Sequence, residues 1–265
     1  MPDNKEVSAD GVVRLTIEGP IARVVFDRPQ AHNAMTWSMY QQLEAICAKL
    51  KADSAIRAVA FSGAGGKAFI AGTDIAQFQA FSSADDGVAY EDQVARFVGA
   101  VDSLPMPTVA VVDGWCVGGG LAIATVCDLR VATPASRFGF PIARTLGNCL
   151  AASVYVRLLA EFGVGRTKRM LMLAEMLTAE EAREAGFVSM IVEPADLAAR
   201  VDEALAKLAQ HAPITMQVGK EAIRRLLTAT RVPDEDLIRR AYGSEDFREG
   251  VAAFVAKRKP AWQGR

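Results

Sequence analysis

The sequence predicts an α/β domain built on a buried, largely parallel sheet and followed by a helical C-terminal region. Two observations support this fold class. Strand-like and helix-like segments alternate through the first half of the 265-residue chain, which is typical of parallel sheets covered by helices. From about Leu150 the periodicity becomes almost entirely helical. We therefore expect an α/β core over residues 1–194 and a helical region over residues 195–265.

The expected elements follow in order along the chain. Two segments rich in β-branched residues flank Gly19-Pro20 and predict a β-hairpin, and Thr36 is placed to cap a helix that runs to about Leu50. Thr178 and Glu181 have the spacing of a capping box. The predicted strands are Val12–Glu18, Ala22–Asp27, Ile56–Phe61, Thr108–Val112, Asp128–Ala132 and a strand-like break at Phe187–Val192, and a helix-like segment covers Glu91–Leu104. Helices are expected from about Ala195 to Lys259.

Composition limits the classes of partner. The net charge is −1 and no basic excess points to nucleic acid or to an anionic membrane surface. No apolar run is long enough to span a bilayer, and the first residues lack the order of a signal peptide. Four scattered cysteines without CxxC spacing indicate reduced thiols in a cytoplasmic protein. With only two histidines, we expect no metal site.

A run of three glycines, Gly118–Gly120, leads directly into an apolar segment of helical length. The first turn of a helix has N–H groups without intrahelical partners, and the macrodipole makes that end electropositive. Glycine also lets another group approach the backbone closely. The turn can therefore stabilise a developing oxyanion. The alternative is that the glycines only allow the helix to pack closely on the sheet.

A second loop, Lys67–Ile75 ("KAFIAGTDI"), favours the first interpretation. It follows the strand predicted at Ile56–Phe61, and the glycine run follows the strand predicted at Thr108–Val112. The carboxyl ends of parallel strands are where α/β proteins bind ligands, so one N–H from each loop could meet at one oxygen. The segment "GAGGKA" at residues 63–68 lacks the third glycine of a dinucleotide loop and the spacing of a phosphate loop.

Several motifs in a fixed order make the chain resemble the enoyl-CoA hydratase/isomerase (crotonase) superfamily over nearly its whole length. They are "FDRPQAHNAMT", "KAFIAGTDI", "DGWCVGGGLAIATVCDLRVAT", "SRFGFP", "AEEAREAGFVSMIV" and "EDFREGVAAFVAKRKPAWQGR". The resemblance implies a crotonase-like spiral of ββα units with a C-terminal helical region. It also implies assembly as a homotrimer or as a hexamer formed from two trimers.

The resemblance further implies an acyl-CoA substrate, with coenzyme A as part of that substrate and no other cofactor. By motif match, the backbone N–H groups of Thr73 and Gly119 would form the oxyanion hole that holds the thioester enolate. The CoA-binding positions implied in the same way are Ala31, Ala71, Phe254 and Lys257. For Phe254 the alternative is packing, and for Lys257 it is a solvated helix face.

The chain departs from the family pattern where hydratases carry two glutamates, because Ala122 and Ile142 occupy those positions. Hydration needs groups that deliver water and protonate the α-carbon, so we expect the standard hydratase route to be closed. In the following loop, Arg144 could hold a substrate carboxylate or form a surface ion pair. Asn148 could orient water or cap a helix, and Cys149 is a nucleophile only if its thiolate is stabilised.

Among the acidic residues, Asp74 is expected to be structural rather than catalytic. Glu91 and Asp92 are expected to begin a helix close to the acyl entrance, either as groups that face it or as favourable charges in the first turn. No proton-transfer residue can be assigned from these motifs. The expected function is therefore an acyl-CoA enzyme that acts through an enolate by isomerase, decarboxylase, lyase or hydrolase chemistry. The alternative is a catalytically inactive acyl-CoA-binding homologue.

Overall fold

The computed structural model describes residues 10–229 and 232–265. Its strands form two sheets, one of six strands in the order β1-β2-β3-β5-β7-β10 and one of four in the order β4-β6-β8-β9. The first sheet contains β1 (Val12–Glu18), β2 (Ile21–Asp27), β3 (Ala58–Gly63), β5 (Thr108–Val112), β7 (Leu129–Ala132) and β10 (Met190–Ile191). The second contains β4 (Ala68–Ile70), β6 (Trp115–Val117), β8 (Arg137–Gly139) and β9 (Leu177–Thr178).

Parallel pairing dominates both sheets, as the buried apolar strands predict. Only β1 with β2 and β8 with β9 run antiparallel among the described strands. The hairpin and the strand Thr108–Val112 are confirmed. The strand predicted at Ile56–Phe61 lies two residues later in the chain. The prediction missed the whole second sheet, because strands of two or three residues are too short to show a periodicity.

The helices that surround the sheets place the site. Helix α1 (Trp37–Ala52) is capped by Thr36, whose side chain accepts a hydrogen bond from the Met39 N–H. Helix α2 spans Ala84–Asp102, so it begins seven residues earlier than predicted and Glu91 lies inside it. Helix α3 (Gly119–Val126) follows the glycine run and is almost entirely buried. Short helices α4 (Ile142–Thr145) and α6 (Ala179–Glu184) flank the long helix α5 (Ala152–Met172), and the predicted capping box at Thr178 is present.

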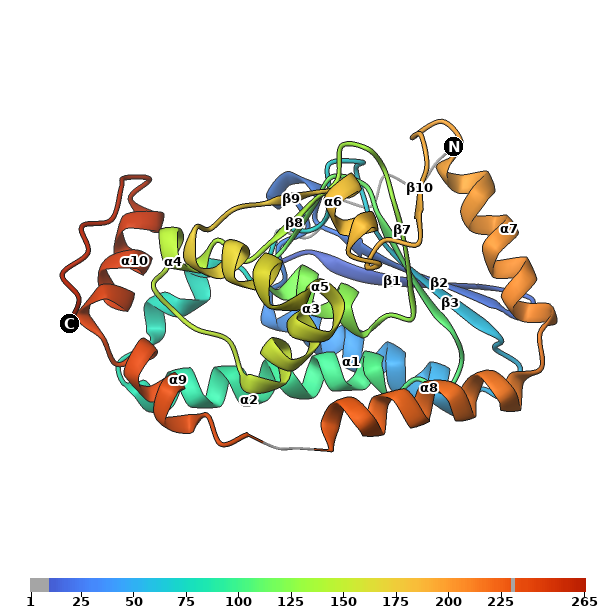
Figure 1. The fold of residues 1–265 in the computed structure, drawn as a ribbon, viewed down its shortest axis with the longest axis horizontal. Helices are drawn as coiled ribbons and strands as arrows, with labels where there is room; N and C mark the ends of the chain where they lie inside the picture. The colour runs from blue at the N-terminus through green and yellow to red at the C-terminus, as the bar shows by residue number, and fades with distance from the viewer. Residues whose placement is uncertain (1–9, 230–231) are drawn as a thin grey trace.

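The C-terminal part of the described chain is helical, with α7 (Leu197–Gln210), α8 (Pro213–Thr228), α9 (Glu235–Tyr242) and α10 (Glu245–Val255). Figure 1 shows α7 and α10 at opposite ends of the long axis. Helix α9 packs on α2, and α10 packs on the 3-10 helix η2 (Ile75–Ala80). Within the described residues, no helix combines the length and hydropathy of a membrane-spanning segment.

Candidate active site

Two neighbouring parallel strands of the small sheet lead into the two candidate loops. Strand β4 ends at Ile70, three residues before Thr73, and β6 ends at Val117, two residues before Gly119. These strands are paired, with Ile70 beside Cys116. The loops therefore leave the same edge of one sheet, as predicted. The strands responsible are β4 and β6 rather than the longer β3 and β5 named from the sequence.

The backbone pairing of Thr73 with Met35 directs the Thr73 N–H away from the Met35 segment. The Met35 N–H donates to the Gly72 carbonyl at 2.8 Å, and the Asp74 N–H donates to the Met35 carbonyl at 2.9 Å. This is a parallel bridge between Met35 and Thr73, in which the backbone hydrogen bonds of Met35 go to Gly72 and Asp74 and not to Thr73 itself. In such a bridge, the N–H of the middle residue points to the other side. The Thr73 N–H is therefore available to a ligand.

Gly119 is the first residue of α3, where an N–H has no intrahelical acceptor. A Cβ placed on Gly119 would lie 3.8 Å from the Thr73 nitrogen and 3.4 Å from the Thr73 Oγ1. Thr73 and Gly119 are thus neighbours in space, although 46 positions separate their numbers in the chain. Both residues are partly exposed. The structure therefore brings together the two residues assigned to the oxyanion hole.

Each glycine of the run has a different physical role. Gly118 has φ +55°, in the left-handed region that favours glycine. A Cβ on Gly120 would come within 2.2 Å of the Ile70 carbonyl oxygen, so this residue allows α3 to pack on β4. Gly119 instead faces Thr73 and the Tyr40 hydroxyl, which a Cβ would meet at 2.5 Å. The packing interpretation of the run is therefore confirmed at Gly120, and the ligand interpretation stays a prediction for Gly119.

Three hydroxyls form a chain beside the paired amides. The Thr73 Oγ1 lies 2.9 Å from the Tyr40 hydroxyl and 2.8 Å from the Tyr90 hydroxyl. Burial raises the pKa of Tyr40 to about 12 and raises the pKa of Tyr90 well above its usual value. Both phenols therefore stay neutral at pH 7. They hold the Thr73 side chain by hydrogen bonds without placing a negative charge beside it.

The side chain of Asn33 joins the loops around the predicted CoA-binding positions Ala31 and Ala71. Its Nδ2 donates to the carbonyls of Ala64 and Ala68 at 2.9 and 2.8 Å, and its Oδ1 accepts from the Arg28 N–H. The Ala71 N–H donates to the His32 carbonyl at 3.0 Å. Ala31 and Ala71 are each partly exposed and lie in segments that these bonds connect.

Asp74 has a structural environment, as expected. Its carboxylate caps η2 by accepting from the Ala76 N–H at 3.0 Å, and it pairs with the Arg28 guanidinium at 2.7 Å. The adjacent Thr73 is therefore held on one side by an ion pair and on the other by the phenols. This arrangement fixes the direction of the Thr73 amide.

A cavity of about 700 Å³ opens beside α3, and Ala122 lies in its wall. The other walls come from α2, the start of α5, the end of α8 and the start of α9. Ala122 is three residues after Gly119, which is a rise of about 4.5 Å along a helix. The cavity therefore begins one helical turn beyond Gly119 on the same helix. Thr73 and Gly119 themselves are not part of its lining.

Glu91 is the buried acid in the wall of this cavity, with 4% of its surface exposed. Its Oε1 accepts from the Tyr242 hydroxyl at 2.6 Å, and its Oε2 accepts from the Ala151 N–H at 3.0 Å. Burial raises the pKa of Glu91 to about 7, opposed by these two hydrogen bonds. The interpretation of Glu91 as an exposed charge in a first helical turn is wrong, because the helix starts at Ala84.

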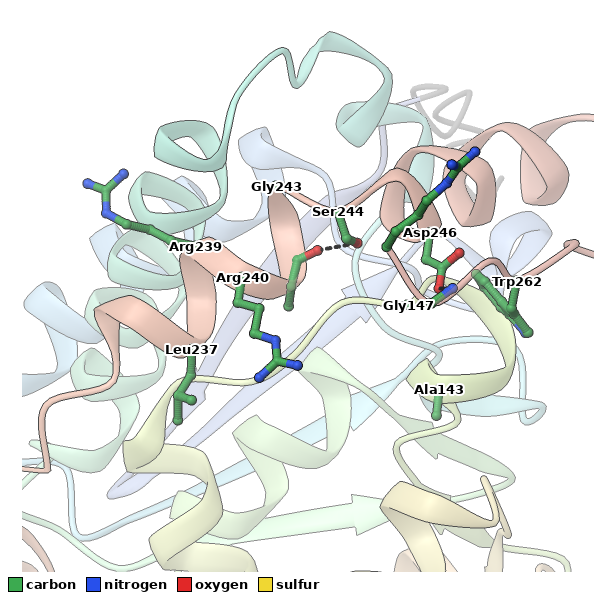
Figure 2. Close-up of a pocket in the computed structure, with 12 residues that line it drawn as sticks. Ala143, Gly147, Leu237, Arg239, Arg240, Gly243, Ser244, Asp246 and Trp262 are labelled. Atoms are coloured by element: carbon green, nitrogen blue, oxygen red, sulfur yellow. Dashed lines mark hydrogen bonds between the residues drawn. The ribbon is translucent and has the colours of Figure 1, made fainter.

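A second cavity, of about 640 Å³, lies between α9, the loop after α4 and the C-terminal segment. Figure 2 shows it between Leu237 and Arg240 on one side and Gly147 and Trp262 on the other. Three predicted acyl-pocket residues line neither cavity: Ile142 packs against the core, Arg144 is exposed, and Asn148 is partly buried. Arg144 forms no ion pair with the described residues, so the alternative of a surface ion pair is not seen here, and its contact with a substrate carboxylate stays a prediction.

The loop after Gly147 contradicts the prediction that Asn148 caps a helix, and its predicted role in orienting water stays a prediction. The residue that caps α5 is Ala151, and Asn148 instead donates from Nδ2 to the Tyr242 hydroxyl at 3.2 Å. Its Oδ1 is buried and has no partner among the described residues. Burial raises the pKa of Cys149 to about 12, which keeps this thiol protonated and argues against a nucleophile. Asn148 therefore belongs to the surroundings of Glu91.

The predicted CoA contacts in the C-terminal region lie at and beyond the end of α10. The Phe254 side chain is 49% exposed. Lys257 follows the helix end and has φ +52°, so it does not lie on the helix face assumed from the sequence. Whether these two residues contact CoA stays a prediction.

Comparisons with known proteins identify the family and the fold. The family described as Enoyl-CoA hydratase/isomerase matches residues 16–265. The short-chain-enoyl-CoA hydratase of Clostridium acetobutylicum is 31% identical over 252 residues, which cover 93% of this chain and 95% of that protein. A crystal structure of an enoyl-CoA hydratase/carnithine racemase from Magnetospirillum magneticum is similar at TM-score 0.78 and 31% identity, covering 99% of this chain and 97% of that one.

A methylmalonyl-CoA decarboxylase in complex with 2-nitronate-propionyl-CoA is similar at TM-score 0.88 and 25% identity, over 96% of this chain and 98% of that one. The fold prediction is therefore confirmed, and the similar proteins include hydratases and a decarboxylase. By the family match and by these neighbours, the chain belongs to the enoyl-CoA hydratase/isomerase family and has the crotonase fold.

Proposed function

We propose that this chain binds acyl-CoA thioesters and catalyses a reaction that passes through the thioester enolate. The observation that carries the proposal is the proximity of Thr73 and Gly119: a Cβ placed on Gly119 would lie 3.8 Å from the Thr73 nitrogen. Two N–H donors on one oxygen stabilise the enolate more than the neutral thioester, because the negative charge develops on that oxygen.

The two-glutamate hydration route does not fit the side chains at the family positions. Ala122 lines the cavity with a methyl group, and Ile142 packs against the core outside it. Neither can activate water or donate a proton. We therefore expect weak hydration of crotonyl-CoA by the unmodified protein. Rapid hydration would contradict this part of the proposal.

Exchange of the α-protons in deuterated water tests the enolate directly. The protein is incubated with a panel of saturated and unsaturated acyl-CoA thioesters, and deuterium at the α-carbon is measured by mass spectrometry. Incorporation that depends on the protein supports an enolate-forming enzyme. Tight binding of the panel with no exchange would instead favour an acyl-CoA-binding protein without catalysis.

We also propose that the chain assembles as a homotrimer or hexamer. Large apolar side chains on α8 are exposed in the single chain, among them Ile214 at 67%, Val218 at 62% and Leu226 at 77%. A row of exposed apolar residues on one helix is typical of a protein interface. Sedimentation velocity measures the state directly, and a monomer at micromolar concentration would contradict the proposal.

A further inference from the structure

The structure provides a candidate for the proton-transfer residue that the sequence motifs do not supply. The inference rests on the proposed function, because it concerns the acyl side of the same site. The oxyanion hole can hold an enolate, but its main-chain amides cannot remove the α-proton. A side chain near the acyl group has to do so. Four carboxyls line the cavity, those of Glu91, Asp92, Asp102 and Asp234, and only Glu91 among them is buried.

Helix α2 connects the oxyanion hole to the cavity through two consecutive residues. The Tyr90 hydroxyl lies 2.8 Å from the Thr73 Oγ1, beside the paired amides. Glu91, the next residue, lines the cavity, as does Ala122 on α3. The glutamate that hydratases carry at the Ala122 position is thus absent from one wall, while this chain has a carboxyl in another wall of the same cavity.

We propose that Glu91 is the general base of this enzyme and acts on the α-carbon of an acyl group held between α2 and α3. Its orientation comes from two hydrogen bonds, from the Tyr242 hydroxyl at 2.6 Å and from the Ala151 N–H at 3.0 Å. Asn148 extends this arrangement, since its Nδ2 donates to the Tyr242 hydroxyl. Tyr242 and Asn148 are therefore positioning residues for the Glu91 carboxylate.

The proposed step is balanced without a co-reactant. The Glu91 carboxylate takes the α-proton, the C–H electron pair forms the enolate double bond, and the carbonyl π pair moves to the oxygen held by Thr73 and Gly119. With a β,γ-unsaturated acyl group, the same carboxylic acid can return the proton to the γ-carbon. The product is the α,β-unsaturated thioester. One carboxyl therefore suffices for double-bond migration, whereas hydration also requires delivery of water.

The electrostatic surroundings make Glu91 effective near neutral pH. Burial raises its pKa to about 7, the hydrogen bonds from Tyr242 and Ala151 lower it, and the carboxylates of Asp234 and Asp92 raise it. The neighbouring Tyr242 phenol is itself held neutral by burial. A base is most effective when its pKa lies near the working pH. These shifts agree with a base, while the cavity and the hydrogen bonds carry the proposal.

A purely structural role makes different predictions, because Glu91 also links α2 to α9 and to the start of α5. The matched control is Asp85→Asn, which removes an exposed ion pair between Asp85 on α2 and Arg239 on α9 but lies outside the cavity. If Glu91 only holds helices together, both variants affect activity through stability alone. If Glu91 is the base, only Glu91→Gln loses the chemical step while it still binds the substrate.

The test uses the full-length protein with butyryl-CoA and with trans-β,γ-hexenoyl-CoA. For Glu91→Gln we expect deuterium exchange and double-bond migration to fall by about 10²–10⁴-fold, with butyryl-CoA affinity retained. Asp85→Asn should change both rates by about threefold or less. The wild-type rate should rise with an apparent pKa near 7. This apparent pKa should be higher in Tyr242→Phe, because the Tyr242 hydroxyl lowers the pKa of Glu91 in the wild type and the variant lacks that hydrogen bond.

The outcomes separate the two levels of the proposal. Exchange in Glu91→Gln at the wild-type rate would overturn the assignment of Glu91 while leaving the enolate function in place. No exchange and no thioester binding by the wild type would overturn the proposed function itself. If Glu91→Gln does not fold, Glu91→Asp keeps a carboxylate and should keep a reduced rate with a pH dependence. A pH-independent rate in that variant would contradict the proposal.

Discussion

The site has two halves that are built from different kinds of atoms. One half lies at Thr73 and Gly119, where α3 begins, and the other is the cavity lined by the later residues of α3. The proposed oxyanion hole consists of main-chain amides, positioned by paired strands and by glycines. The proposed acyl cavity consists of side chains from α2, α3, α5, α8 and α9. A main-chain site tolerates changes in its surroundings because its donors are present in every residue except proline. A side-chain site can change its chemistry by one substitution, as Ala122 illustrates.

Among the changes predicted for the two halves of the site, loss of the Gly119 N–H should have the largest effect on the rate of α-proton exchange. Proline suits the first residue of a helix and removes only the donor from the backbone. Because the added ring would meet the Tyr40 hydroxyl, the change is made in a Tyr40→Phe background. There, Gly119→Pro should lower α-proton exchange by about 10²–10³-fold.

The matched control is Gly119→Ala in the same Tyr40→Phe background, which adds a Cβ but keeps the N–H. Circular dichroism and sedimentation confirm that both variants fold. If the proline and alanine variants exchange equally fast, the Gly119 amide is not a donor in the reaction.

The buried carboxyl of Glu91, in the cavity half of the site, should make the free energy of unfolding depend on pH. The pKa of Glu91 is raised from an ordinary 4.5 to about 7 in the folded protein. The folded state therefore binds the proton more tightly, so stability from this group is full below about pH 4.5 and falls as pH rises to about 7. Glu91→Gln removes this pH-dependent loss. The free energy of unfolding of Glu91→Gln minus that of the wild type should therefore be about 1–3 kcal/mol larger at pH 8 than at pH 5.

Urea unfolding at several pH values, from pH 5 to pH 8, measures this difference between wild type and Glu91→Gln. The Asp85→Asn variant serves as the reference for an exposed carboxylate. A constant difference between wild type and Glu91→Gln over that range would show that the carboxyl titrates normally and is not effectively buried.

The sequence motifs predicted the main-chain half much better than the side-chain half. Glycine signals close approach or an unusual φ, but the run alone left packing and ligand binding open, and the second loop and the family motifs were needed to assign Gly119. Glu91, Tyr242 and Ala151 are up to 151 positions apart, and no local pattern shows that a fold brings them together. The strands β4 and β6 were missed because they are only three residues long, although the loops that follow them were found.

Gly120 should affect stability and not chemistry, which separates it from Gly119. A Cβ at Gly120 would lie 2.2 Å from the backbone oxygen of Ile70, which cannot move without shifting β4. Gly120→Ala should therefore cost about 1–3 kcal/mol of the free energy of unfolding. Urea unfolding gives the value, and an unchanged midpoint would contradict the close packing of α3 on β4.

The smallest effect is expected at Arg144. This residue is exposed and lines neither cavity. Arg144→Ala should change the free energy of unfolding by about 0.5 kcal/mol or less and leave the affinity for acyl-CoA unchanged. A large loss of affinity for acyl groups that carry a carboxylate would show that Arg144 reaches the substrate after all.

The central claim is that the amides of Thr73 and Gly119 polarise the thioester carbonyl. The most direct measurement is the infrared difference spectrum of butyryl-CoA bound to the protein, with an isotope label at the carbonyl carbon. Two hydrogen bonds to the oxygen weaken the C=O bond, so the carbonyl band should move to lower frequency on binding, and Gly119→Pro in the Tyr40→Phe background should reverse much of that shift. A bound thioester whose carbonyl band stays at its frequency in water, or moves above it, would contradict the claim.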